Sequence, residues 1–217
     1  LTNGEIFFAS SVNSLKNLMQ QKVDLNIQRS YDYLVHGDYD SNNCSFFKNV
    51  HHLKAAHYFY FDLDKQVATK PIKWWSVDIS TNEKISFQEA SHKLRELFIE
   101  SVKLHLRSDV PIGVTLSGGI DSSSIASVIK YIDPNIKLKT FSFISEDKKI
   151  SEEKWIDYLN SKLNYNSQKI EINSNEFEDD LRNLCEKQEE PFGSTSVYAQ
   201  YKVFEKVKQT GVKVILD

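Results

Sequence analysis

A cluster of glycines and serines is the first group of residues whose types and spacing could do chemistry. The chain has only seven glycines, and Gly113, Gly118 and Gly119 all lie in the segment 110–124. This segment reads as an apolar strand, a turn of small residues and the start of a helix. Glycines let a backbone turn tightly against a ligand, and a helix start adds N–H donors and a positive dipole end. The segment therefore predicts a phosphate or pyrophosphate site, with hydroxyl donors from Ser117, Ser122 and Ser123.

Three better-known loop motifs fit this segment poorly. A Walker A loop needs a lysine that is absent here, GxGxxG is missing, and Gly-Gly-Ile-Asp-Ser does not supply GxSxG. Asp121 is unexpected in a simple anion site because its carboxylate would repel phosphate, unless a Mg²⁺ ion lies between them. The alternative is a structural turn in which Asp121 and Ser122 only cap a helix. The complete Ser-Gly-Gly-Ile-Asp-Ser-Ser sequence favours the phosphate site.

Other chemically capable residues show no comparable pattern. Cys44 and Cys185 lie far apart and form no CxxC, which argues against a disulfide scaffold or a cysteine zinc site and favours a reducing cytoplasm. The six histidines have no metal-ligand spacing. The acidic stretch 171–190 is typical of a solvated helix face, and within it only Glu190, before Pro191, is expected near an active site.

The elements that must position the phosphate site begin at Ser86. Ser86 and Glu89 have the spacing of a capping box, which predicts the start of a long amphipathic helix. Strands and helices then alternate, which predicts an α/β fold with a parallel sheet covered on both faces. The expected strands are 110–116, 138–144, 168–172 and 212–216, and the expected helices are 122–131, 152–163, 176–188 and 197–209.

Residues 1–75 have a different character, because they read as mostly β with one or two short helices. We therefore expect a domain boundary near 73–85, with domains at 1–75 and 76–217. The chain shows no signal-peptide pattern, and it stops in an apolar strand at the edge where α/β proteins usually place functional residues. These features predict a fragment cut at both ends.

Composition excludes several classes of protein. The chain has 217 residues, 40% hydrophobic and 26% charged, as in ordinary globular proteins. Its formal net charge is −3, so no overall basic field supports binding to nucleic acid. No apolar run approaches the roughly 18 residues that a membrane span needs.

The loop sequence resembles that of a known enzyme superfamily. Residues 117–122, Ser-Gly-Gly-Ile-Asp-Ser, are similar to the pyrophosphate loop of the N-type ATP pyrophosphatases. Residues 108–114, Ser-Asp-Val-Pro-Ile-Gly-Val, make the resemblance specific to glutamine-dependent asparagine synthetases. Residues 189–192 resemble that family's Asp-Glu-Pro-Phe element, and residues 211–217 resemble the strand before its second nucleotide loop. The chain departs from the family at 54–57, where Lys-Ala-Ala-His stands in place of a Pro-Gly-His turn.

The resemblance implies a fold and a reaction. Residues 76–217 would form the first part of a Rossmann-like, adenine-nucleotide α-hydrolase-like synthetase domain, preceded by the β-rich remnant of an Ntn-type glutaminase domain. The family uses ATP and Mg²⁺ to convert aspartate to β-aspartyl-AMP with release of pyrophosphate, and ammonia from glutamine then gives asparagine. The implied partners are aspartate, glutamine and ATP, without nucleic acid or membrane. The implied location is cytoplasmic, and a homodimer is compatible with the resemblance.

The resemblance also implies roles residue by residue. Asp121 would be the catalytic carboxylate that holds Mg²⁺. Thr115 would contact adenine through its backbone, and Phe143 would be the next adenosine contact. Asp217 would stand at the start of the third adenosine contact. Core packing is an alternative for Phe143, and Glu190 is the one expected substrate contact. The residues that would bind pyrophosphate are Ser117, Gly118, Gly119, Asp121, Ser122 and Ser123.

Two other functions stay open at this point. The same scaffold serves other adenylating, amide-forming enzymes, such as β-lactam synthetases and lasso-peptide cyclases, and the loop does not separate them. A non-catalytic nucleotide-binding relative is the second alternative, and Asp121 argues against it because a simple binder needs no metal carboxylate. No cysteine lies near the N-terminus, so the chain as it stands is expected to be inactive.

Overall fold

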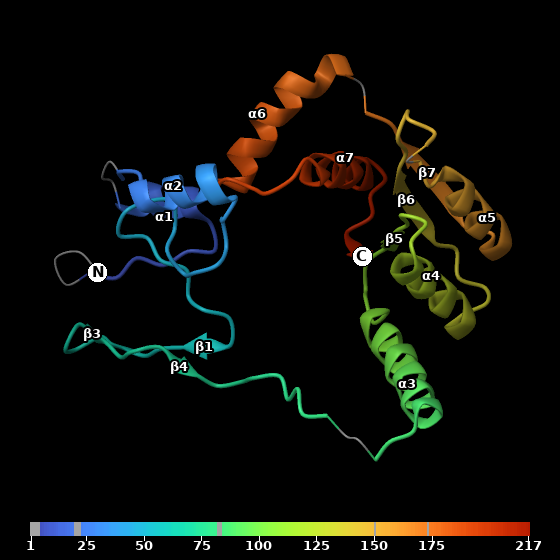
Figure 1. Ribbon diagram of the computed structural model, residues 1–217, viewed down its shortest axis with the longest axis horizontal. Coiled ribbons are helices and arrows are strands. Elements are labelled where there is room, and N and C mark those ends of the chain that lie inside the picture. Colours follow the sequence, from blue (N-terminus) through green and yellow to red (C-terminus); the bar gives the residue numbers. More distant parts are fainter. Residues whose placement is uncertain (1–4, 20–22, 82–83, 150, 173) are drawn as a thin grey trace. The chain divides into compact units, whose positions relative to one another are not determined.

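The computed structural model describes residues 5–19, 23–81, 84–149, 151–172 and 174–217 (Figure 1). Contacts divide the chain into two compact units. The first comprises Leu1–Thr81 with Arg182–Ser194, and the second comprises Asn82–Leu181 with Thr195–Asp217. No helix of the described residues has the length and apolar character needed to cross a membrane.

The second unit is built on a parallel sheet of four strands. The strands are β5 (Ile112–Thr115), β6 (Lys139–Phe143), β7 (Asn166–Ile170) and β8 (Val214–Leu216). Their order across the sheet is β7-β6-β5-β8, and every neighbouring pair is parallel. This confirms the predicted α/β fold, and it brings the carboxyl ends of all four strands to one edge of the sheet.

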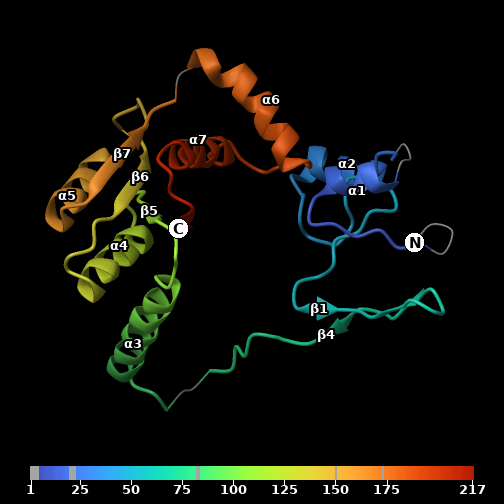
Figure 2. The same cartoon turned by 180° about the vertical axis from the view of Figure 1, so that it is seen from behind.

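Helices cover both faces of this sheet, as predicted (Figures 1 and 2). One face carries α4 (Ile120–Ile132) and α5 (Glu153–Leu163), and the other carries α7 (Ser196–Gln209). Side chains along β6 and the residues next to it alternate between the two faces of the sheet, so the core has two parts. Leu138 and Ile144 pack with α4 and α5, and Phe141 packs with α7. Asn160 fixes α5 on the sheet, because it accepts a hydrogen bond from Thr140 at 2.7 Å and donates one to Ser167 at 3.1 Å.

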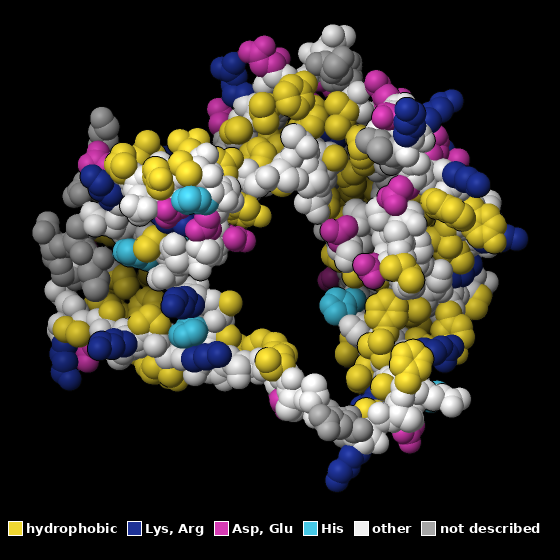
Figure 3. Space-filling view, viewed as in Figure 1, with side chains coloured by type: hydrophobic (Ala, Val, Ile, Leu, Met, Phe, Trp, Pro, Cys, Tyr) yellow, Lys and Arg dark blue, Asp and Glu magenta, His cyan; other side chains and the backbone are white. Residues whose placement is uncertain are grey.

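The predicted capping box begins α3 (Phe87–His105). The Ser86 hydroxyl accepts the Glu89 N–H at 3.2 Å, and the Glu89 carboxylate accepts the Ser86 N–H at 3.0 Å. Only the later part of the helix is packed, because Val102 is buried while Leu94 and Leu97 are 68% and 61% exposed. Figure 3 shows the resulting hydrophobic surface over α3 and α4 on the face that it draws.

The start of α6 (Phe177–Gln188), which follows the short helix η1 (Ser174–Glu176), is attached to α7 by polar and aromatic contacts. The Tyr198 hydroxyl donates to Asp180 at 2.8 Å, and its ring meets Phe177 edge-on at 5.1 Å. Burial and the bond to Asp180 raise the pKa of Tyr198 to about 12. Burial alone would lower the pKa of Lys202, but its hydrogen bonds to Asp180, Glu205 and Glu176 raise it above its usual value. These contacts fix α7 to the start of α6.

The first unit contains short elements. Its helices are α1 (Val12–Met19) and α2 (Ile27–His36), and its antiparallel pairs are β1 (His57–Tyr58) with β4 (Ile72–Lys73) and β2 (Phe61–Asp62) with β3 (Val67–Ala68). Residues 182–194 join this unit through Glu189. Its carboxylate accepts the Ser11 hydroxyl at 2.6 Å and the Val12 N–H at the start of α1. These hydrogen bonds, led by that from Ser11, lower the pKa of Glu189.

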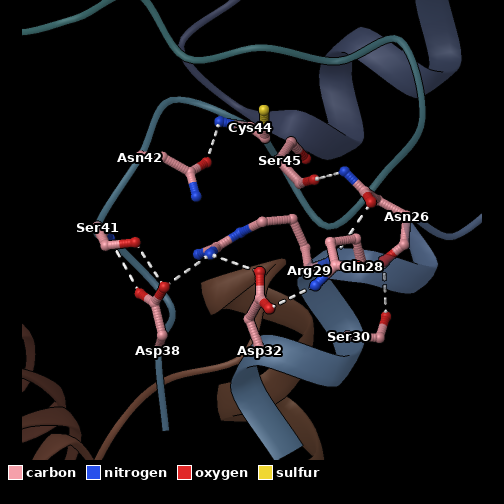
Figure 4. A network of polar contacts seen from close by, with 10 residues as sticks. All are labelled: Asn26, Gln28, Arg29, Ser30, Asp32, Asp38, Ser41, Asn42, Cys44 and Ser45. Carbon is pink, nitrogen blue, oxygen red and sulfur yellow. Dashed lines mark hydrogen bonds and ion pairs between the residues drawn. The ribbon is translucent and has the colours of Figure 1, made fainter. Parts of the chain in front are cut away.

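A buried arginine organises the polar part of this unit (Figure 4). Arg29 on α2 is 2% exposed and pairs with Asp38 at 3.1 Å and with Asp32 at 3.6 Å. Hydrogen bonds from Ser41, followed by the arginine, lower the pKa of Asp38 to about 2. Asn26 caps α2 beside them, since its side chain accepts the Arg29 N–H at 3.3 Å. The loop after α2 is therefore tied to the helix by charge and hydrogen bonding together.

Replacing Arg29 should destabilise the protein. Arg29→Met removes the buried partner of two partly exposed carboxylates, Asp32 and Asp38, so the loop after α2 loses its ion pairs to the helix and the free energy of unfolding should fall. Chemical denaturation followed by circular dichroism measures this decrease. Arg95→Met is the matched control, because Arg95 is exposed on α3 and only lies over Tyr131. Equal unfolding midpoints for the two variants would show that the Arg29 pairs contribute little.

Candidate functional site

The predicted phosphate loop lies at the carboxyl edge of the sheet, between β5 and α4. Gly118 has φ +85°, in the left-handed region that favours glycine. A Cβ atom at this position would lie 3.1 Å from the Glu152 Cβ and 3.3 Å from the Glu152 carbonyl oxygen. Gly119 differs, since its φ is −70° and a Cβ there would meet only the Ser117 hydroxyl at 3.3 Å. The tight turn therefore requires glycine at 118 and not at 119.

Serine side chains brace this loop from within. The Ser122 hydroxyl accepts the Ser117 N–H at 3.2 Å and lies 3.1 Å from the Ser117 hydroxyl. The Ser117 hydroxyl also accepts the Gly119 N–H at 3.3 Å. The structure thus brings these two predicted residues together, with their oxygen atoms gathered over the start of α4.

The start of α4 offers free donors. No side chain caps this helix, and the first helical hydrogen bond runs from the Ser123 N–H to the Gly119 carbonyl oxygen at 3.1 Å. Within the described residues, the N–H groups of Ile120, Asp121 and Ser122 therefore have no partner in the protein. Free N–H groups at a helix start, with the positive end of the dipole, form a site suited to an anion.

A cavity of about 250 Å³ opens beside this loop, entirely within the second unit. Its lining comes from the β5 end and its loop, the start of α4, the β6 end, the start of α5, one side of α7 and the end of β8. It brings together five of the predicted residues, Thr115, Ser117, Ser122, Phe143 and Asp217. The remaining lining residues are Leu116, Phe141, Glu152, Ala199, Gln200 and Val203. Phe143 also packs against the core below α7, which shows the core-packing interpretation, and its contact with adenosine stays a prediction.

Asp217 is held at the end of β8 by two neighbours. The Thr115 hydroxyl on β5 donates to one carboxylate oxygen, and the Gln200 amide on α7 donates to the other at 3.3 Å. Neither Gln200 nor Glu152 was expected in the site from the sequence. Glu152 has one signal that could have found it, because an acidic residue directly after the second strand's loop must lie at the same sheet edge.

Asp121 lies in the first turn of α4 and is exposed. Its neighbours in a separate groove include Ser91, Arg95 and Phe98 of α3, and it does not line the 250 Å³ cavity. No protein group pairs with its carboxylate among the described residues. Those residues also contain no cluster of three or more His, Cys, Asp or Glu side chains suited to a metal.

This set of donors fits a Mg²⁺ ion that the protein coordinates only in part. Mg²⁺ is commonly bound by one or two carboxylates, with phosphate oxygens and water completing its coordination. An unpaired carboxylate and serine hydroxyls beside an anion site match that arrangement, whereas they do not form a complete protein cage. The residues therefore suit a metal that arrives with a polyphosphate.

Glu190 lies in the first unit, and all of its described contacts are within that unit. Its carboxylate accepts the Ser45 hydroxyl at 2.6 Å and the Phe46 N–H at 2.8 Å, and it pairs with His52 at 2.9 Å. It also lines a cavity of about 730 Å³ in this unit. Its expected role as a substrate contact stays a prediction.

Comparison with known proteins gives a consistent picture. The model of the asparagine synthase family matches residues 93–217. A Methanocaldococcus jannaschii protein, provisionally named as a glutamine-hydrolysing asparagine synthetase, is 29% identical over 214 residues, which are 98% of this chain and 39% of the relative. Glutamine-hydrolysing asparagine synthetase 2 of Bacillus subtilis is 32% identical over 153 residues, 65% of this chain and 20% of the relative. The amidase chyE of Penicillium rubens is 35% identical over 88 residues, which are 39% of this chain and 13% of the relative. This chain spans less than half the length of these relatives.

Two solved structures show a partial likeness. The NH₃-dependent NAD synthetase of Campylobacter jejuni aligns with 60% of this chain and 56% of its own, at 20% identity and a TM-score of 0.36. The NMN synthetase of Francisella tularensis aligns with 60% and 54%, at 19% identity and a TM-score of 0.35.

The two loop glycines should respond differently to the same substitution. Gly118→Ala forces a side chain into a left-handed backbone and against Glu152, so we expect the loop to lose its shape and the anion site to weaken by roughly 10-fold or more. Gly119→Ala is the matched control and should have a much smaller effect. Titration calorimetry with Mg·pyrophosphate measures both. Similar affinities for the two variants would show that the Gly118 turn does not form the anion site.

Proposed function

Because this chain belongs to the asparagine synthase family, we propose that its phosphate loop binds the pyrophosphate part of ATP during formation of an acyl-adenylate. The acyl group is the side-chain carboxylate of aspartate, which becomes β-aspartyl-AMP. Ammonia derived from glutamine then displaces AMP and gives asparagine. The observation that carries this proposal is the uncapped start of α4 beside Gly118, at the sheet edge where the cavity opens.

The chemistry of adenylation matches these donors. Attack of a carboxylate oxygen on the α-phosphorus breaks the bond to the pyrophosphate, and negative charge grows on that leaving group. Preorganised N–H groups stabilise such charge without reorganising during the reaction. In this chain, the N–H groups of residues 120–122 and the hydroxyls of Ser117 and Ser122 would supply them.

The remaining roles are those that the family resemblance implies, and Thr115, Phe143 and Asp217 have in common that they line the cavity. Thr115 and Phe143 would contact the adenosine, and Asp217 would lie beside them at the end of β8. Ser123 and Gly119 would complete the pyrophosphate loop. Asp121 would hold Mg²⁺, which when bound neutralises phosphate charge and acts as a Lewis acid on a phosphoryl oxygen.

The first unit belongs to the same proposal. Residues 1–75 would be the last part of an Ntn-type glutaminase domain, and residues 76–217 the first part of the synthetase domain. Glutamine would be the source of ammonia, and Glu190 would contact the aspartate or its adenylate. Pyrophosphate release by the full-length protein, measured with aspartate and with other carboxylates, tests the reaction and its acceptor. Release that does not depend on aspartate would contradict the assignment to asparagine formation.

Asp121 provides the sharpest test of the metal role. Asp121→Asn in the full-length protein should lower the rate of pyrophosphate release by about 10²-fold or more, by analogy with loss of one preorganised electrostatic group. Glutamine hydrolysis should survive, because it would belong to the other domain.

Asp133→Asn is the control for Asp121→Asn. Asp133 lies at the other end of the same helix, where its carboxylate accepts the Asn135 N–H at 2.9 Å, and it does not line the cavity, so its replacement should leave the rate nearly unchanged. A normal rate in Asp121→Asn would exclude the metal role, provided that thermal melting shows both variants to be folded.

A further inference from the structure

The candidate anion site lacks positive side chains of its own. Glu152 and Asp217 line the cavity beside the loop, and Asp121 lies in the first turn of α4, so carboxylates surround the place where phosphate would bind. Among the described residues, no lysine, arginine or histidine side chain lines that cavity. A basic side chain that reaches the loop from outside the cavity would therefore stabilise a bound polyphosphate.

Helix α5 places one lysine on the outer side of the loop. Trp155 lies in the first turn of α5, and its Cβ is 3.4 Å from the position that a Cβ atom would take at Gly118. Trp155 is 57% exposed, and the ammonium of Lys154 lies over its ring, 5.4 Å from the ring centroid. Attraction between a cation and the face of an aromatic ring holds the ammonium there. Trp155 thus connects the charge of Lys154 to the loop at Gly118.

The charge of Lys154 is available to a ligand. Lys154 is exposed, and no carboxylate of the described residues pairs with it. Lys169 shows the contrast along the same helix, because it pairs with Glu153 at 2.8 Å and with Asp157 at 2.7 Å. Lys154 also stands in the first turn of α5, where the helix dipole disfavours a cation. Neither an ion pair nor the helix dipole therefore accounts for a lysine at this position.

We propose that Lys154 binds a phosphate of the pyrophosphate group held by the loop, and that Trp155 positions its ammonium for this contact. The inference rests on the proposed function, because it requires a pyrophosphate group at the loop. A lysine ammonium is a compact charge on a flexible stem, so it can move from the ring of Trp155 to a bound phosphate. Since negative charge grows on the pyrophosphate during adenylation, the same ammonium would stabilise the leaving group.

Removal of the charge tests the contact. In titration calorimetry on the full-length protein at low ionic strength, Lys154→Gln should bind Mg·pyrophosphate roughly 10-fold more weakly than the unaltered protein, because a hydrogen bond between charged groups is lost. Lys154→Arg keeps the charge and should retain most of the affinity. The difference between Lys154→Gln and the unaltered protein should shrink as salt is added, since salt screens exposed charges.

The positioning role of Trp155 needs a separate measurement, because Trp155 also packs against the loop. Trp155→Leu removes the ring and should weaken binding of Mg·pyrophosphate, whereas Trp155→Phe keeps a ring and should restore it. In a Lys154→Gln background, Trp155→Leu should have little further effect, since residues that act through one contact change affinity non-additively. Additive losses would show that Trp155 acts on the loop alone and would overturn its positioning role.

Lys162→Gln is the matched control for Lys154→Gln. Lys162 lies in the last turn of α5, and its ammonium is 5.7 Å from the centroid of the Tyr158 ring. Its replacement removes the same charge and the same kind of ring contact away from the loop, so the affinity for Mg·pyrophosphate should stay nearly unchanged. Equal affinities for the two variants would overturn the Lys154 contact and leave the proposed function standing. Failure of the unaltered protein to bind Mg·pyrophosphate would overturn the proposed function, and the Lys154 contact with it.

Discussion

The left-handed turn at Gly118 is the constraint on which the candidate site depends. β5 ends at Thr115 and α4 begins at Ile120, so only a few residues reverse the chain between them. With φ +85° at Gly118, the loop closes tightly enough for Ser117 and Ser122 to touch. The same closure leaves the first N–H groups of α4 facing outward, without a side-chain cap. A Cβ atom at 118 would also press on Glu152, which lines the neighbouring cavity, so a side chain there would disturb the turn and this wall together.

The packing of the sheet explains why this turn stands where a cavity can form. β6 contributes Phe141 to the core under α7 and its flanking residues to the core under α4 and α5. Val203 and Val207 fix α7 on the sheet, and Lys202 and Tyr198 fix its other side through Asp180. Held in this way, α7 presents Ala199 and Gln200 at the sheet edge. Apolar packing and a partly buried ion pair thus position side chains of the cavity that lie far from the loop in sequence.

Local patterns gave the predictable part of this molecule. The capping box at Ser86, the alternation of strands and helices, and the Gly-Gly turn each depend on a few neighbouring residues, so the sequence reveals them directly. The membership of residues 182–194 in the first unit depends on Glu189 reaching Ser11, a contact that no local pattern encodes. The sequence did not predict Gln200 in the site for the same reason, because only the fold brings it to Asp217. Glycine is required at 118 and not at 119 because only Gly118 has a positive φ, and the sequence Gly-Gly does not show which of the two residues has it.

The charges of the site restrict how it can bind a polyphosphate. The described lining of the cavity offers hydroxyls, Glu152 and Asp217, but no basic side chain, and Asp121 adds a third carboxylate nearby. Among the described residues, no lysine or arginine side chain that lines the cavity can therefore contact a phosphate there. The favourable terms that remain in the cavity are the N–H groups and dipole of α4 and a cation brought by the ligand. Such a site favours a metal-complexed polyphosphate over a free one, and that preference makes an unpaired Asp121 at an anion-binding helix start physically reasonable.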